Sequence, residues 1–186
     1  MLYPDDGDFA RAYWRVAIEF AFLEARIDEL LGNVTAVTAE SHRSRLERCL
    51  RKGTFVNKVK VLQKILSHRE RQPHAAGGEE IRRGYSALEA CLFLADDRND
   101  VFHSPIIADL RTDEVVRVSK RYGKYSITSE EVYKLARQIH STSGGVLGLG
   151  FTFARLFQPA RLGTTSEQLD KLLDDLIQDP SASPPS

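Results

Sequence analysis

The sequence is poor in the residues that build disulfide frameworks and membrane spans. It has only two cysteines in 186 residues, Cys49 and Cys91, and they match neither a CxxC pair nor a zinc-binding pattern. No segment approaches the roughly 20 uninterrupted apolar residues that cross a bilayer. The acidic N-terminus has no apolar run behind a basic stretch, so we expect no secretory or transit peptide. These absences predict a cytoplasmic protein with free thiols and no membrane anchor.

Metal and nucleotide-binding patterns are missing as well. Four of the five histidines are scattered without matching carboxylates or thiols, namely His42, His68, His74 and His140. The glycine-rich stretch 144–150 lacks the Gly-Lys-Ser/Thr ending of a phosphate loop, and it does not join a strand to a helix. It predicts close helix packing or a kink instead. We therefore expect no metal and no cofactor.

The net charge is zero, but the charge is unevenly distributed. Residues 41–71 contain ten lysines and arginines and two glutamates, a local net charge of +8. Acidic segments near both ends of the chain balance this excess. Such asymmetry can form a polyanion-binding face on a neutral protein. A solvated helix face is the simpler explanation on charge alone.

Apolar periodicity predicts a helical protein. The strongest pattern runs from Phe9 to Leu31, with apolar residues at 9, 13, 16, 20, 23, 27 and 30. Asp8 is a plausible N-cap, and a glycine and an asparagine follow the pattern at 32 and 33. Ile18 and Phe22 lie off this seam, where they widen the buried face or form a subunit contact.

Three more main helices follow. One is expected at about 54–67, preceded by a shorter basic helical stretch around residues 46–50. The next starts near Glu79 and has its apolar stripe at 81, 85, 88, 92 and 95; Pro105 blocks its continuation. The last opens at the capping-box pattern Thr128-Ser-Glu-Glu131.

The segment between the third and fourth main helices differs in character. Alternating valines and tyrosines on both sides of Gly123 predict a small β-hairpin at about 114–127. The expected fold is therefore all-α, a four- to five-helix up-down bundle with an inserted hairpin. Residues 1–160 form the helical domain, and 161–186 form a short amphipathic helix (164–177) followed by a disordered tail.

The most informative residues close the third helix, which reads Arg98-Asn99-Asp-Val-Phe-His103. An arginine that stays charged and a histidine that titrates near neutrality suit holding a phosphate and moving a proton beside it. Positions five apart point about 140° apart on a straight helix. The pair can meet if the helix unwinds before Pro105. It can also meet if the apolar stripe packs on its own copy across a twofold axis, with Asn99 fixing the register. Alternatively, both residues simply favour the negative end of the helix dipole.

This motif resembles the signature of the HEPN superfamily, an arginine followed by four to six residues and a histidine, often with asparagine directly after the arginine. The order of helices is also similar, over about residues 9–157. The resemblance implies a homodimer in which the Arg and His of both subunits surround one cleft. Many members are metal-independent endoribonucleases of toxin–antitoxin, phage-defence or RNA-surveillance systems. Others are non-catalytic binding modules.

The resemblance assigns roles to three residues. His103 would act as general base or acid at the ribose 2′-OH or the leaving oxygen. Arg98 would clamp the scissile phosphate. Asn99 would orient His103, donate to the phosphate, or serve only as a seam residue. The substrate would be RNA, because cleavage without a metal needs the 2′-OH nucleophile.

The basic segment would then follow the RNA backbone, and two hairpin tyrosines would stack on bases. These residues are Arg51, Lys52, Lys58, Lys60 and Lys64, with Tyr122 and Tyr125. An antitoxin or defence-system partner is implied. However, Pro105 stands where some HEPN toxins carry a modified tyrosine, which puts that form of antitoxin pairing in doubt. Two alternatives stay open: a non-catalytic HEPN module that binds RNA, a nucleotide or a protein, and an unrelated helical dimerisation protein.

Overall fold

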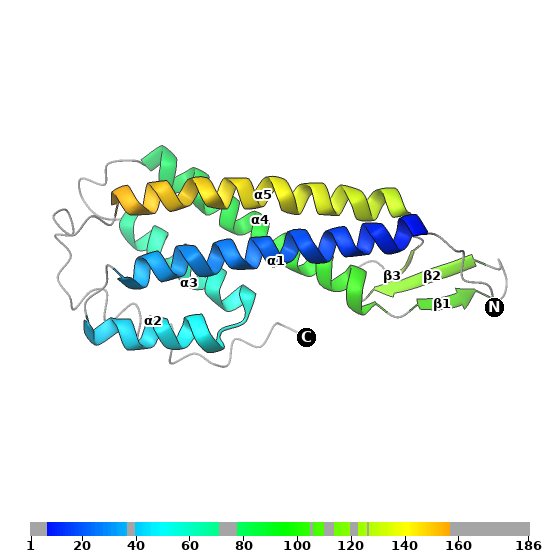
Figure 1. Cartoon of the computed structure of the whole chain (residues 1–186), viewed down its shortest axis with the longest axis horizontal. Helices are drawn as coiled ribbons and strands as arrows, with labels where there is room; N and C mark the ends of the chain where they lie inside the picture. The colour runs from blue at the N-terminus through cyan, green and yellow to red at the C-terminus, as the bar shows by residue number, and fades with distance from the viewer. Residues whose placement is uncertain are drawn as a thin grey trace. The chain divides into compact units, whose positions relative to one another are not determined.

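The computed structural model describes residues 7–36, 40–70, 78–104, 106–109, 114–119, 123–125 and 127–156. This part of the chain is predominantly helical, which confirms the helical class. Its elements are α1 (Gly7–Ala36), α2 (Glu40–Lys52), α3 (Phe55–Glu70), α4 (Gly78–His103), β1 (Ile106–Asp109), β2 (Glu114–Ser119), β3 (Gly123–Tyr125) and α5 (Ser129–Leu156) (Figure 1). The amphipathic helix and tail expected after residue 160 lie outside the described residues, as do Pro105 and Tyr122.

The chain divides into two compact units. The first combines Met1–Glu24 with Glu89–Gly144, and the second combines Ala25–Leu88 with Gly145–Ser186. The first unit contains the N-terminal part of α1, the end of α4, the three strands and most of α5. It therefore holds the whole Arg98–His103 motif. The expectation of a single helical domain over residues 1–160 stays a prediction.

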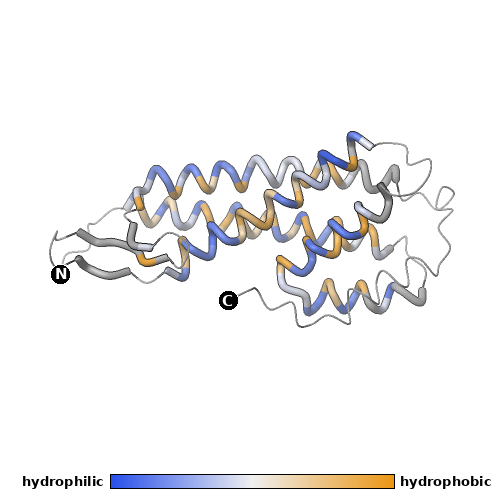
Figure 2. Tube along the Cα trace, turned by 180° about the vertical axis from the view of Figure 1, so that it is seen from behind, coloured by the Kyte–Doolittle hydropathy of each residue, from blue (hydrophilic) through white to orange (hydrophobic). Residues whose placement is uncertain are grey.

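α1 buries the face that its periodicity predicts. Val16, Phe20 and Leu23 are buried in the first unit, and Ile27 and Leu30 in the second. Figure 2 shows hydrophobic residues recurring along the helices, as an amphipathic pattern requires. The face of α1 opposite the buried seam is also apolar, but it is exposed. It consists of Trp14, Ile18 and Phe22, of which Trp14 is 70% exposed. Ile18 and Phe22 therefore do not widen the buried face; a role in a subunit contact stays a prediction.

The strands form one antiparallel sheet in the order β1-β2-β3. β2 and β3 pair antiparallel, with Ser119 opposite Gly123. Gly123 has a φ of 69°, which glycine adopts without steric cost. β1 pairs along β2 with Ile107 opposite Val116. The sequence analysis did not anticipate β1, because four residues directly after Pro105 are too few to show a period and are defined only by their partner strand.

The capping box of α5 forms as its pattern predicts. The Glu131 side chain accepts a hydrogen bond from the Thr128 backbone N–H at 2.7 Å, and the Thr128 hydroxyl accepts one from the Glu131 N–H at 3.2 Å. α5 then continues as a helix through the glycine-rich stretch 144–150. Close helix packing does involve this stretch, at Leu149, but the glycine that permits it is Gly84 of α4, where a Cβ atom would lie 2.5 Å from the Leu149 side chain.

The basic stretch expected to hold a short helix around residues 46–50 is the longer helix α2, which ends at Lys52, directly before Gly53. The Gly53 N–H donates to the Cys49 carbonyl at 2.7 Å, and a Cβ at position 53 would lie 2.4 Å from that oxygen, so only glycine fits without a backbone shift.

Among the helices of the described residues, none combines the length and apolar character needed to cross a membrane.

Candidate functional site

The end of α4 presents two rows of residues with different surroundings. One row, at 88, 91, 95, 98 and 102, follows the buried side of the helix, where Cys91 and Ala95 are buried. The other, at 92, 96, 99 and 103, follows a more exposed side and ends at His103, the last residue of the helix. Arg98 belongs to the first row and His103 to the second. The two residues of the motif therefore lie on different faces of one helix.

Arg98 is held between aromatic rings. Its guanidinium carbon lies 5.2 Å from the centre of the Phe20 ring on α1 and 5.1 Å from the centre of the Phe102 ring. Both separations are within the range of cation–π attraction. The Arg98 Nη1 donates to the side-chain oxygen of Asn99 at 3.1 Å, while Nε is buried and has no partner among the described residues.

The charge of Arg98 is not neutralised within the described part of the chain. Other arginines there bind carboxylates, for example Arg83 to Glu79 and Arg26 to Glu29. Arg98 forms no such pair, although it is half-buried and held in place. A rigid, unpaired guanidinium with spare N–H donors is the group that binds phosphate in two-point fashion.

α1 fixes the last turn of α4. The Tyr13 hydroxyl donates to the Val101 carbonyl at 3.2 Å, and the Tyr13 ring meets Phe102 edge to face with 5.4 Å between centres. The hydrogen bond satisfies a carbonyl of the helix end, where intrahelical partners are missing. The motif thus stands on a helix terminus that is tied to its neighbour.

The helix does not unwind between Arg98 and His103. α4 stays helical through His103, and the Ser104 N–H still donates to the Asp100 carbonyl at 3.2 Å. No hydrogen bond joins Arg98 to His103 within the described residues. Asn99 is exposed and its side-chain oxygen bonds Arg98, so in this structure it positions the arginine and not the histidine.

The predicted dimer stripe of α4 is only partly available for a partner. Leu88 and Ala95 are buried in the chain itself, whereas Tyr85 and Asn99 are exposed. The stripe as a whole therefore cannot pack on its own copy. In the first unit, Phe93, Asn99 and His103 of α4 are exposed. Asn99 and His103 share one side of the helix, and Phe93 lies on a different side.

An acidic cavity of about 430 Å³ lies beside the same helix end. Asp97 and Asp100 of α4 line it together with Glu131 and Lys134 of α5. Three carboxylates against one lysine repel a polyanion. RNA approaching Arg98 would therefore avoid this side of α4.

The predicted RNA-contacting residues all belong to the second unit. Lys52, Lys60 and Lys64 are exposed, and exposed Arg51 pairs with Glu47 at 3.6 Å. Lys58 differs, because its side chain is only 14% exposed and its Nζ lies 2.6 Å from Asp28. Its charge is paired with that carboxylate, and RNA contact by any of these residues stays a prediction. Of the two tyrosines, Tyr125 belongs to β3 and Tyr122 lies outside the described residues.

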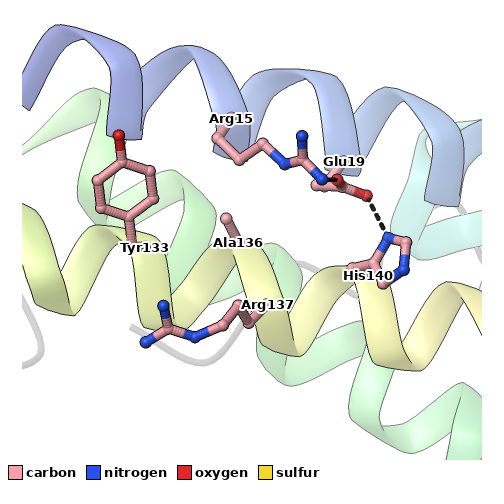
Figure 3. A pocket seen from close by; sticks show the side chains of 6 residues that line it. All are labelled: Arg15, Glu19, Tyr133, Ala136, Arg137 and His140. Carbon is pink, nitrogen blue, oxygen red and sulfur yellow. Dashed lines mark hydrogen bonds and ion pairs between the residues drawn. The ribbon is translucent and has the colours of Figure 1, made fainter. Parts of the chain in front are cut away.

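The structure also brings His140, which has no matching carboxylate nearby in the sequence, beside the carboxylate of Glu19. Glu19 of α1 is buried, with its side chain 5% exposed, and it has two partners: Arg15 Nη2 at 2.6 Å and His140 Nδ1 at 2.9 Å (Figure 3). His140 lies 121 positions from Glu19. The only trace in the sequence is a glutamate beside the apolar seam of α1, between Val16 and Leu23.

Metal and thiol chemistry find no support in the described residues. No group of three or more His, Cys, Asp or Glu side chains there is arranged to hold a metal ion. Burial raises the pKa of the Cys91 thiol to about 12, and burial also raises that of half-buried Cys49. Raised pKa values leave little thiolate at neutral pH, so neither cysteine is an activated nucleophile.

Comparison of the chain with models of known protein families, with curated protein sequences and with solved structures gave no match.

Proposed function

We propose that this protein is a metal-independent endoribonuclease of HEPN type, which acts in the cytoplasm as a homodimer. The observation that carries the proposal is the state of Arg98. Its guanidinium is fixed between two aromatic rings and has no carboxylate partner among the described residues, and a histidine follows five positions later at the same helix end. A scissile phosphate would supply the missing anion.

The residues divide the chemistry as follows. Arg98 binds the phosphate and offsets the charge that develops in the transition state. His103 is exposed and moves the proton of the 2′-OH or of the leaving oxygen, a role that contributes typically about 10²–10⁴-fold. Asn99 holds the guanidinium through its side-chain oxygen.

The position of the two residues on different faces of a straight helix favours a composite site. Within one chain they diverge by about 140°. Two copies related by a twofold axis can instead bring Arg98 of one subunit to His103 of the other.

The test is cleavage of mixed cellular RNA by purified protein in EDTA. The wild type should produce 2′,3′-cyclic phosphate ends, and Arg98→Ala and His103→Ala should each lower the rate at least about 10²-fold. Arg83→Ala is the matched control, since Arg83 is an exposed arginine on the same helix. Cleavage that persists in both motif variants would remove the proposed site.

A second function is favoured by the same divergence of the two side chains. If the subunits do not bring Arg98 and His103 together, the motif binds RNA without cutting it, as in a non-catalytic HEPN module. Binding of RNA by the wild type, weakened in Arg98→Ala and unaccompanied by cleavage of any RNA tested, would assign this function.

A further inference from the structure

A cavity of about 310 Å³ lies between α1 and α5 in the first unit. Arg15, Glu19, Tyr133, Ala136, Arg137 and His140 line it (Figure 3). The α5 residues Tyr133, Arg137 and His140 are spaced four and three apart, so they share one face of the helix. This face meets Arg15 and Glu19, one helical turn apart on α1.

Glu19 organises the cavity. A carboxylate is costly to bury unless hydrogen bonds and opposite charges compensate it. Here each of its oxygens has one partner, Oε1 the Arg15 guanidinium and Oε2 the His140 imidazole. The carboxylate thus holds a guanidinium from α1 and an imidazole from α5 at one place.

Each partner uses only one of its polar nitrogens on Glu19. Arg15 contacts it through Nη2, which leaves the other donors of the guanidinium. His140 uses Nδ1, its side chain is 72% exposed, and its Nε2 has no partner among the described residues. The Tyr133 hydroxyl is likewise without a hydrogen-bond partner there. The cavity is therefore lined by polar groups that have no further partner among the described residues.

The remaining cation can be released for a ligand. Arg137 Nη2 binds Glu130 at 2.6 Å, but both side chains are largely exposed. Exposed ion pairs contribute little, so a more highly charged anion can replace Glu130. Two guanidiniums and a phenol offer several N–H and O–H donors to one group, and the imidazole adds one more when it is protonated on both nitrogens. Such a set suits the oxygens of a phosphate dianion.

We propose that this cavity binds a small phosphomonoester. The phosphate would lie between Arg15 and Arg137, with the Tyr133 hydroxyl donating to it. His140 would donate to it through Nε2–H in its doubly protonated, imidazolium form, because Nδ1–H bonds Glu19. Its organic group would lie on the apolar floor at Ala136 and beside the Tyr133 ring. The cavity volume accommodates a phosphate and a group as large as a pentose. The inference is independent of the proposed ribonuclease activity, because none of these residues belongs to the Arg98–His103 motif.

The test is isothermal titration calorimetry of the full-length protein with ribose 5-phosphate, in a phosphate-free buffer of low salt. Binding with a Kd of about 1 mM or lower is expected, with no heat from ribose and with competition by inorganic phosphate. Arg137→Gln and Arg15→Gln should each weaken binding about tenfold or more. Tyr133→Phe should weaken it less, because a neutral donor is lost.

Two controls locate the ligand. Arg83→Gln removes an arginine from a similar exposed ion pair and should leave the Kd unchanged. Arg98→Ala should also leave it unchanged. Loss of binding in Arg98→Ala in place of Arg137→Gln would move the phosphate to the motif and overturn the proposal, as would absence of binding by the wild type.

A last arm distinguishes a small ligand from an RNA end. A 5′-phosphorylated dinucleotide should bind no more tightly than ribose 5-phosphate, because the cavity has room for one small group. Tighter binding of the dinucleotide would overturn the assignment to a small phosphomonoester. Arg137→Gln keeps the interpretation sound if Arg15→Gln fails to fold, since Arg137 contacts no buried carboxylate.

Discussion

His103 and His140 each belong to a group that includes an arginine of the first unit, but the groups differ. His103 follows Arg98 by five positions in the sequence, whereas His140 and Arg15 contact the same glutamate. His103 is exposed at the end of α4, and its motif partner Arg98 occupies the buried row of the same helix. His140 is exposed too, yet its Nδ1 is fixed by a buried glutamate that also binds Arg15. A short motif marks residues by spacing alone, whereas the second cluster exists only because two helices pack together. The comparison separates a proposed site that would need a second subunit from a cluster that a single chain assembles.

Mixing of inactive subunits tests the first half of this comparison and has the largest expected effect. Arg98→Ala and His103→Ala are each inactive, but a heterodimer of the two carries one intact composite site. After subunit exchange we expect about a quarter of the wild-type cleavage rate, because half of the dimers are mixed and one of their two sites is intact. The rate is measured on the same RNA before and after exchange. No recovery, with heterodimers shown by mass spectrometry, would place both residues in one chain.

Arg98→Lys tests whether cleavage depends on the guanidinium group and its stacking on the two rings, or on the positive charge alone. Lysine keeps the positive charge but loses the planar fork and its stacking between Phe20 and Phe102. We expect cleavage to fall about 10²-fold while the dimer persists. Arg83→Lys on the same helix is the matched control. A lysine variant with wild-type kcat/KM would show that Arg98 acts only as a point charge.

Substitution of His140 should affect stability more than substitution of His103, although only His103 is proposed to act in cleavage. His140→Ala removes one of two partners of buried Glu19 and should lower the free energy of unfolding by about 1 kcal/mol. The exposed position of His140 keeps this cost below that of a fully buried pair. His103→Ala should change it by less than about 0.5 kcal/mol. Urea denaturation measures both, and equal costs would contradict the different anchoring.

The smallest expected effect is in the proton positions of the imidazoles. When His140 is neutral, its hydrogen bond to Glu19 requires the proton on Nδ1. Long-range ¹H–¹⁵N spectra assign the tautomer of each ring, with His140→Gln identifying the signal. Glu19→Gln should release this preference, while the His103 signal stays the same. An Nε2–H tautomer for His140 in the wild type would mean that Glu19 does not orient it.

The fold was largely predictable from local patterns. The seam of α1 and the capping box at Thr128 depend on neighbours in sequence, and the structure has both. β1 was missed because a four-residue strand is defined by its partner. The extension of α2 beyond the predicted stretch likewise exceeds what its few apolar residues indicate.

The sites were less predictable, for a physical reason. The motif is local, so Arg98 and His103 could be singled out from spacing, but the two rings beside Arg98 could not, since Phe20 is far away in sequence. Nothing in the sequence distinguishes Lys58 from the other lysines of the basic segment, because its partner Asp28 lies on another helix. Glu19 and His140 were separated by 121 positions, and no spacing rule connects residues that far apart.

The two cysteines, one in each compact unit, make the protein its own probe of local opening. Cys91 lies in the first unit and Cys49 in the second. With the pKa of Cys91 raised to about 12, only about 10⁻⁴ of that thiol is ionised at pH 8, so alkylation reports the rare opening that exposes it. Cys49, half-buried, should react sooner, and rates followed at both thiols along a urea series would show whether the two units open together or separately.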